Sequence, residues 1–179
     1  FKTFNVPVII VRSTNNFGPY QHPEKLIPLF TTNAIENKKL PLYGEGSNKR
    51  DWLYVLDNCE AIYLLMNKGT IGEVYNVGAG NERTNLEVTK VILKELKKPA
   101  SLIELVKDRL SHDKRYSIDC SKIKSLGWKT QYKFEKALAE TIKWYVNNEF
   151  WWKKIKHGTF NEYYTKQYEK KWQHTDQTN

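Results

Sequence analysis

The chain has 179 residues, of which 40% are hydrophobic and 13% aromatic, and this composition excludes a disordered chain. Its 29 Lys and Arg outnumber 20 Asp and Glu, so the net charge of +9 predicts an anionic partner: a nucleic acid, a membrane surface or a phosphorylated small molecule. Two cysteines exclude a disulfide scaffold, and no Cys and His cluster has metal-site spacing.

The predicted elements alternate between strands and helices, which is typical of an α/β fold. In chain order we expect strand 8–12, helix 26–38, strands 41–43 and 51–55, helix 57–68, strand 73–77, helix 85–96, strand 102–106, and helices 121–126 and 134–145. The first strand is a continuous β-branched run that predicts full burial in a parallel sheet. Asp57 and Asn85 are expected to cap the helices that they begin.

Three polar loops carry side chains suited to ligand binding. Asn15 and Asn16 follow the first strand, where ligands of open α/β sheets bind, although an Asx-rich turn is as good an explanation. Tyr43 and Arg50 flank a Gly-rich turn and could stack on a base and pair with a phosphate; a plain β-turn is the alternative. The loop 108–116 could cradle a diphosphate or be a solvated charged loop.

The excess of positive charge is concentrated near the C-terminus. Residues 121–179 hold 12 basic and 6 acidic side chains among many aromatics. Such a segment could bind nucleic acid, but the excess is Lys and no nucleic-acid module accompanies it. We therefore expect a solvated basic and aromatic extension at 156–179 and no nucleic-acid partner. No apolar run approaches the roughly 20 residues of a spanning helix, and no secretory signal pattern occurs, so we expect a cytoplasmic protein without membrane contact.

Several longer motifs occur in one order along the chain. They are RSTNNFGPYQ at 12–21, PEKLIP at 23–28, LPLYGEG at 40–46, RDWLYV at 50–55, GEVYNVG at 72–78, NLEV at 85–88, DR at 108–109, HD at 112–113, RY at 115–116 and LGW at 126–128. Over about residues 5–155 this order resembles the C-terminal half of the dTDP-glucose 4,6-dehydratases, a family of extended short-chain dehydrogenase/reductases. Leu110 and Ser111 stand where that family usually has Pro-Gly.

The resemblance implies a fold, a reaction and a set of binding residues. The fold is the smaller substrate-binding domain together with the late strands and helices of the Rossmann-type NAD domain, over residues 1–155. The reaction oxidises the sugar at C4 with NAD, eliminates water across C5–C6 and returns the hydride to C6. Asn16 is implied to contact NAD. The implied sugar-nucleotide residues are Asn15, Lys25, Leu26, Pro41, Tyr43, Arg50, Asn85, Arg109, His112 and Tyr116.

The family's Gly-rich NAD loop, Tyr/Lys pair and acidic catalytic residues all precede the strand 8–12 in the resemblance. We therefore expect a piece of a longer enzyme with no catalytic residue of its own and no turnover in isolation. The whole enzyme would be a homodimer serving dTDP-rhamnose biosynthesis. A UDP-sugar 4,6-dehydratase or 4-epimerase of the same superfamily remains an alternative, as does a basic nucleic-acid-binding module.

Overall fold

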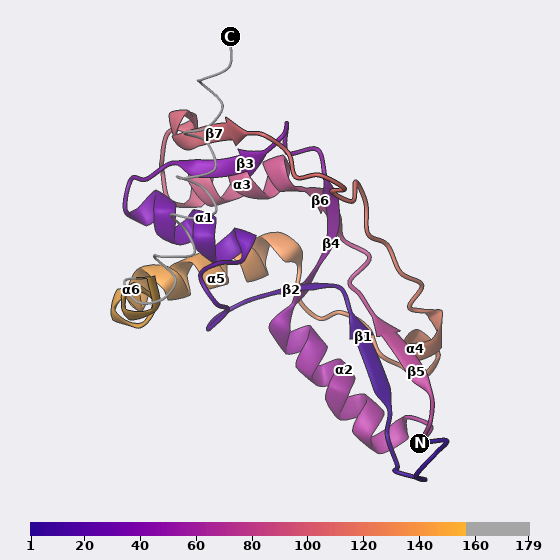
Figure 1. Ribbon diagram of the computed structural model, residues 1–179. Coiled ribbons are helices and arrows are strands. Elements are labelled where there is room, and N and C mark those ends of the chain that lie inside the picture. Colours follow the sequence, from indigo (N-terminus) through magenta and orange to yellow (C-terminus); the bar gives the residue numbers. More distant parts are fainter. Residues whose placement is uncertain (157–179) are drawn as a thin grey trace.

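The computed structural model describes residues 1–156, in which short strands alternate with helices (Figure 1). This arrangement confirms the predicted α/β class. The strands are β1 (Ile10–Ser13), β2 (Asn15–Phe17), β3 (Leu40–Tyr43), β4 (Lys49–Tyr54), β5 (Val74–Val77), β6 (Glu82–Thr84) and β7 (Ile103–Val106). The helices are α1 (Leu26–Ile35), α2 (Val55–Lys68), α3 (Asn85–Glu95), α4 (Ser121–Ser125), α5 (Phe134–Asn147) and α6 (Glu149–Lys156), with a 3-10 turn at Ala100–Leu102. The predicted extension at 156–179 lies outside the described residues except for Lys156.

Three small sheets organise the described chain. β1 pairs with β5 and β3 pairs with β7, both in parallel, while β4 lies between parallel β2 and antiparallel β6. In Figure 1, β1, β5, α2 and α4 form one part of the molecule and β3, β7, α1 and α3 form the other. The short strands β2 and β4 run between these two parts, so residues at the ends of β1 and β4 lie where the parts meet.

Each part has its own hydrophobic core. The larger core packs α1, α3 and α5 together, with Phe30, Ile92 and Leu138 each at most 3% exposed. The smaller core packs α2 against β5 through Leu65 and Val77. The apolar residues that recur at helical spacing in the sequence are the ones that the helices bury in these two cores.

The expectation of a fully buried first strand is wrong. Val8 is 37% exposed and Ile10 is 50% exposed, whereas Ile9 and Val11 pack against the smaller core. A fully buried parallel strand needs neighbours on both edges and cover on both faces. Within residues 1–156, β1 has β5 along one edge and the smaller core on one face, so alternate side chains remain exposed.

Both predicted helix caps are displaced. Thr84, not Asn85, caps α3 through a capping box in which Thr84 Oγ1 accepts from Glu87 N at 3.1 Å and the Glu87 carboxylate accepts from Thr84 N at 2.6 Å. α2 begins at Val55 after Tyr54, so Asp57 lies inside its first turn. There the Asp57 carboxylate accepts from Gln131 N at 2.7 Å and fastens a distant loop to the helix. β2, β6 and α6 were not expected from the sequence.

A buried ion pair joins α6 to α1. Lys156 Nζ lies 2.7 Å from Glu36 Oε2 and 2.9 Å from Asn33 Oδ1, and Lys156 is 8% exposed. Burial lowers the pKa of Lys156, and the pairing with Glu36 opposes that effect. The contact therefore holds α6 against α1 and the larger core, while the Lys156 ammonium group loses its contact with water.

Candidate functional site

Arg109 and His112 meet Tyr43 where the loop after β7 passes the end of β3. The Arg109 guanidinium carbon lies 5.1 Å from the centre of the Tyr43 ring, and the His112 ring meets the same ring edge-on at 6.1 Å. Arg109 Nη2 lies 2.9 Å from His112 Nε2, and His112 Nδ1 lies 2.5 Å from Asp108 Oδ1. The hydrogen bond from His112 lowers the pKa of Asp108, so this carboxyl is ionised at neutral pH.

Arg50 forms a second cation and aromatic pair, with Tyr116. Its guanidinium carbon lies 4.4 Å from the Tyr116 ring centre, and its Nη2 donates to the backbone oxygen of Asp113 at 2.9 Å. Tyr116 Oη donates in turn to the Asp113 carboxylate, and this bond raises the pKa of Tyr116. Burial lowers the pKa of Arg50, and the nearby charge of Arg109 lowers it further. The charges of the two guanidinium groups thus act on each other.

Backbone hydrogen bonds fasten this loop to the start of β4. Lys49 N donates to Lys114 O at 2.8 Å, and Tyr116 N donates to Lys49 O at 3.4 Å. Asn48 Nδ2 adds a bond to Asp113 O at 3.2 Å. The second half of the loop 108–116 is thus hydrogen-bonded to the start of β4, although all of the loop except His112 is exposed, and its role in diphosphate binding stays a prediction.

The turn between β3 and β4 allows the close approach. Gly44 and Gly46 have φ of 54° and 70°, in the left-handed region that glycine adopts without strain. A Cβ at Gly46 would lie 2.6 Å from Leu42 Cδ2, and one at Gly44 would lie 3.3 Å from Asp108 Oδ2. Gly46 thus leaves room for Leu42, and Gly44 leaves room for the Asp108 side chain.

Asn85 and Pro41 lie on the elements next to this cluster. Asn85 begins α3, is 8% exposed and donates its backbone N–H to Asn48 O at 3.0 Å. Its side-chain Oδ1 is buried and has no hydrogen-bond partner among the described residues. Pro41 is buried in β3 opposite Glu104. The roles of both residues in binding stay predictions.

The other four predicted residues lie on β2 and the start of α1. Asn15 is exposed, whereas Asn16 is half-buried and its Oδ1 has no hydrogen-bond partner within residues 1–156. Lys25 precedes α1 and is exposed in an ion pair with Glu24 at 2.8 Å. Leu26 packs against the larger core. The contacts described for Arg50 and Arg109 involve none of these four.

The turn after β2 is anchored from α5. Tyr145 Oη donates to Gln21 O at 2.6 Å, and Gln21 Nε2 donates to Asn16 O at 2.8 Å. Tyr145 is fully buried, and burial raises the pKa of its hydroxyl. The position of Asn16 therefore depends on a tyrosine from a much later helix.

We call the Arg109–Tyr43 and Arg50–Tyr116 pairs, with the residues that contact them, the arginine clusters. The sequence analysis did not propose three of those contacting residues as site residues: Asp108, Asp113 and Asn48. Asp108 could have been considered, because a carboxylate in the same short loop as His112 can pair with its imidazole, as it does here at 2.5 Å. Arg115 belongs to the loop 108–116, which the sequence analysis offered as a diphosphate cradle. Its guanidinium instead holds Glu82 through two bonds of 2.7 and 2.6 Å, tying the loop to β6.

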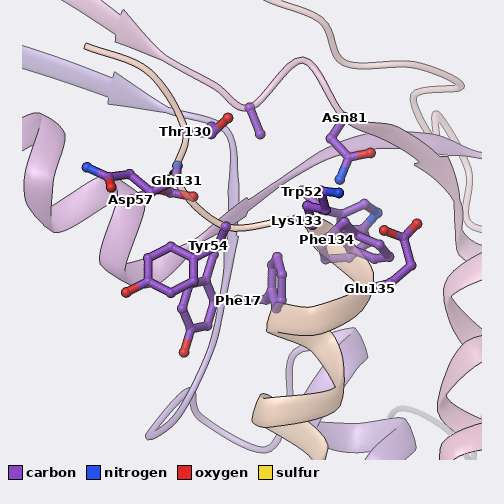
Figure 2. Close-up of a pocket in the computed structure, with 12 residues that line it drawn as sticks. Phe17, Trp52, Tyr54, Asp57, Asn81, Thr130, Gln131, Lys133, Phe134 and Glu135 are labelled. Carbon is purple, nitrogen blue, oxygen red and sulfur yellow. Dashed lines mark hydrogen bonds between the residues drawn. The ribbon is translucent and has the colours of Figure 1, made fainter.

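A separate cavity of about 420 Å³ lies between β4, the 79–81 loop and the start of α5 (Figure 2). Figure 2 shows Phe17, Trp52 and Phe134 on one side of it and Asp57, Thr130 and Gln131 on the other. None of the predicted binding residues lines this cavity. It is therefore distinct from the arginine clusters.

Two further features bear on the class of site. Within residues 1–156 no three His, Cys, Asp or Glu side chains are grouped so that they could hold a metal ion. Across the same residues no helix combines the length and apolar character needed to cross a membrane.

Parallel strands, a polar loop after β1 and clustered cations and aromatic rings are features expected of part of an extended short-chain dehydrogenase/reductase. A family model described as GDP-mannose 4,6 dehydratase matches residues 1–141, and the chain belongs to this family. The resemblance found in the sequence is thereby confirmed.

Individual relatives agree with this assignment. The chain is 50% identical to a dTDP-glucose 4,6-dehydratase of Haemophilus influenzae over 159 residues, covering 82% of this chain and 47% of the relative. A crystal structure of dTDP-glucose 4,6-dehydratase from Bacillus anthracis in complex with NAD is 54% identical, with a TM-score of 0.81 over 86% of this chain and 49% of that one. An epimerase of Methanothermobacter thermautotrophicus is 27% identical, with a TM-score of 0.79 over 86% of this chain and 47% of its own. The chain thus spans about half the length of these relatives.

Proposed function

We propose that this chain forms the sugar-nucleotide-binding half of a dTDP-glucose 4,6-dehydratase. The observation that carries the proposal is the pair of arginines, Arg50 and Arg109, each lying over a tyrosine ring. Planar guanidinium forks pair with phosphate oxygens through two parallel hydrogen bonds. Aromatic faces next to them suit a nucleobase or sugar. The combination matches a nucleoside diphosphate linked to a sugar.

In this proposal Arg50 and Arg109 hold the diphosphate, with His112 and Tyr116 beside them. Tyr43 and Pro41 flank the base, and Lys25 and Leu26 cover the nucleotide. The buried, unpartnered Oδ1 of Asn85 is a hydrogen-bond acceptor for which a ligand donor would be the partner. Asn15, exposed at the start of β2, contacts the sugar nucleotide.

The residues at the carboxyl end of β1 fit the nicotinamide end of NAD. Asn16 Oδ1 and Thr14 Oγ1 are buried polar atoms without hydrogen-bond partners among the described residues. They lie where dinucleotide-binding sheets receive their ligand, and an amide-bearing ring could satisfy them. NAD, when bound, supplies the hydride acceptor and donor of the reaction. The chain's own part there is to orient that ring from Asn16, which the Tyr145 and Gln21 bonds hold in place.

The alternative is a UDP-sugar 4,6-dehydratase or 4-epimerase. The twofold higher identity to the Bacillus anthracis dehydratase than to the methanogen epimerase favours the dehydratase. We further propose that the whole enzyme is a cytoplasmic homodimer acting in dTDP-rhamnose biosynthesis. The free thiols Cys59 and Cys120 suit a reducing compartment.

The test is calorimetric titration of the 179-residue chain with dTDP-glucose, UDP-glucose and GDP-mannose. We expect saturable binding that is tightest for dTDP-glucose. Arg109→Ala should weaken it by about 10- to 150-fold, the range for a lost hydrogen bond to a charged group of about 1.5–3 kcal/mol. Lys136→Ala removes an exposed cation from α5 and should leave affinity unchanged.

Unchanged affinity in both Arg109→Ala and Arg50→Ala would overturn the site. Tightest binding of UDP-glucose would favour the alternative enzymes. Affinity for DNA above that for any sugar nucleotide, falling steeply with salt, would instead favour the nucleic-acid module.

A further inference from the structure

The hydrogen bonds around His112 determine its protonation in the unliganded chain. Arginine has only donors, so the 2.9 Å contact between Arg109 Nη2 and His112 Nε2 requires a lone pair on Nε2. The single ring proton is then on Nδ1, 2.5 Å from Asp108 Oδ1. The His112 side chain is only 6% exposed, so water does not replace these partners. With these two partners Nε2 is the acceptor of the ring and Nδ1 its donor while Arg109 points at it.

The groups in contact with His112 are Asp108 and Arg109 from its own loop and the Tyr43 ring from β3. Arg50 of β4 pairs with Tyr116 and with Asp113, and its charge interacts with that of Arg109. The positive charges of Arg50 and Arg109 balance the negative charges of Asp108 and Asp113. A sugar-linked diphosphate brings two negative charges, and the imidazole is the member that can gain a proton near neutral pH.

We propose that sugar-nucleotide binding is coupled to proton uptake at His112, with Asp108 as the positioning residue. As Arg109 turns its donors to the diphosphate, Nε2 takes a proton from solvent and becomes a second donor to the phosphate. Nδ1–H stays on Asp108, whose negative charge favours the imidazolium. This inference rests on the proposed function, because it needs the diphosphate at Arg109.

Gly44 makes this arrangement possible. The space that a Cβ at Gly44 would occupy lies 3.3 Å from Asp108 Oδ2, so the glycine admits the carboxylate beside Tyr43. In the proposed complex, successive contacts from Gly44 to Asp108, from Asp108 to His112 and from His112 to Arg109 would connect the end of β3 to the diphosphate. A histidine in a plain solvated loop would have neither partner.

The experiment is titration calorimetry of the full chain with dTDP-glucose near neutral pH, in two buffers that differ in ionisation enthalpy. This ligand is chosen because its diphosphate is esterified at both ends and carries no proton that titrates near pH 7. We expect uptake of up to one proton per bound ligand. The affinity should fall by as much as tenfold for each pH unit above neutrality, the limit for one linked proton.

His112→Gln keeps an acceptor for Arg109 but cannot titrate, so it should bind with no proton uptake and a flat pH profile. Asp108→Asn should retain binding with reduced uptake. Binding by the unmodified chain without buffer dependence, or uptake that persists in His112→Gln, would overturn the coupling. Uptake in Asp108→Asn equal to that of the unmodified chain would overturn the role of Asp108. Failure of the unmodified chain to bind dTDP-glucose at all would refute the proposed function itself.

Discussion

Tyr145→Phe tests whether α5 stabilises the turn that carries Asn16. The substitution removes one hydroxyl and leaves the ring in place, so no large cavity forms. It deprives Gln21 O of the donor that lies 2.6 Å away in a fully buried position. Because the Gln21 carbonyl is only partly buried, its lost hydrogen bond should cost about 1 kcal/mol, near the lower end of the roughly 1–3 kcal/mol for a fully buried group. For a domain of this size that corresponds to a lower melting temperature by roughly 2–4 °C per kcal/mol.

Urea denaturation followed by tryptophan fluorescence measures this loss, since Trp144 packs against Tyr145 with ring centres 4.9 Å apart. The dependence on urea concentration should keep its slope, because the surface exposed on unfolding does not change. Tyr63→Phe is the matched control: Tyr63 is 66% exposed on α2, and its loss of a hydroxyl should cost less than about 0.5 kcal/mol. Equal stabilities for the two variants would refute the assigned role of the Tyr145 hydroxyl.

Three further outcomes follow from the same structure. Glu36→Gln leaves Lys156 charged, buried and without its carboxylate, and should lower the free energy of unfolding by about 3 kcal/mol in urea. Lys38→Ala breaks only the exposed ion pair of the same carboxylate and should cost less than about 1 kcal/mol. Burial raises the pKa of Glu36, but its bonds to Lys156 and Lys38 outweigh burial, so its folded pKa lies below 4.5. The stability from this pair is then fully present above pH 4.5 and lost as pH falls through the folded pKa, and acid titration of Glu36→Gln should show a smaller loss. Gly46→Ala forces a left-handed residue and a Cβ into Leu42, and should both destabilise the chain by more than about 1 kcal/mol and weaken dTDP-glucose binding.

The helices and the alternation of elements could be predicted because they depend on local spacing. The apolar stripe that begins at Leu26 is the buried face of α1, and the prediction differs from it by only a few residues at the end. The capping box was also present in the sequence as Thr84 followed by Glu87 three positions later, and that signal was overlooked in favour of Asn85. The prediction that Asp57 caps α2 was wrong for another reason. An Asp near the start of a helix is typical of a cap, but here its carboxylate accepts a hydrogen bond from Gln131 N, and nothing in the local sequence shows that partner.

The burial of the first strand could not be predicted from its own residues. A run of β-branched side chains indicates affinity for a sheet interior, but exposure depends on which neighbours are present along each edge and face. Ile10 is 50% exposed although it is a β-branched residue in a strand, so the composition of the strand does not determine its burial within residues 1–156.

The binding residues divide in the same way. Motif order indicated Tyr43, Arg50, Arg109, His112 and Tyr116 one by one, without showing which would meet. Arg50 meets Tyr116 because the second half of the loop after β7 is hydrogen-bonded to β4, and Arg109 meets Tyr43 because β7 pairs with β3 up to Tyr43 and Val106. The same packing assigned Arg115 to Glu82, although its sequence context resembles that of Arg109.

The net charge of +9 by itself pointed to an anionic partner, and the order of motifs by itself indicated the family and the class of ligand. Charge and motif order are properties of the chain that survive unfolding. Which cations are available to a ligand, and which partner each ring nitrogen of His112 has, were decided only by tertiary structure. The physical reason is that a guanidinium or an imidazole takes its role from hydrogen-bond partners within about 3 Å, and those partners come from strands and loops far apart in the sequence.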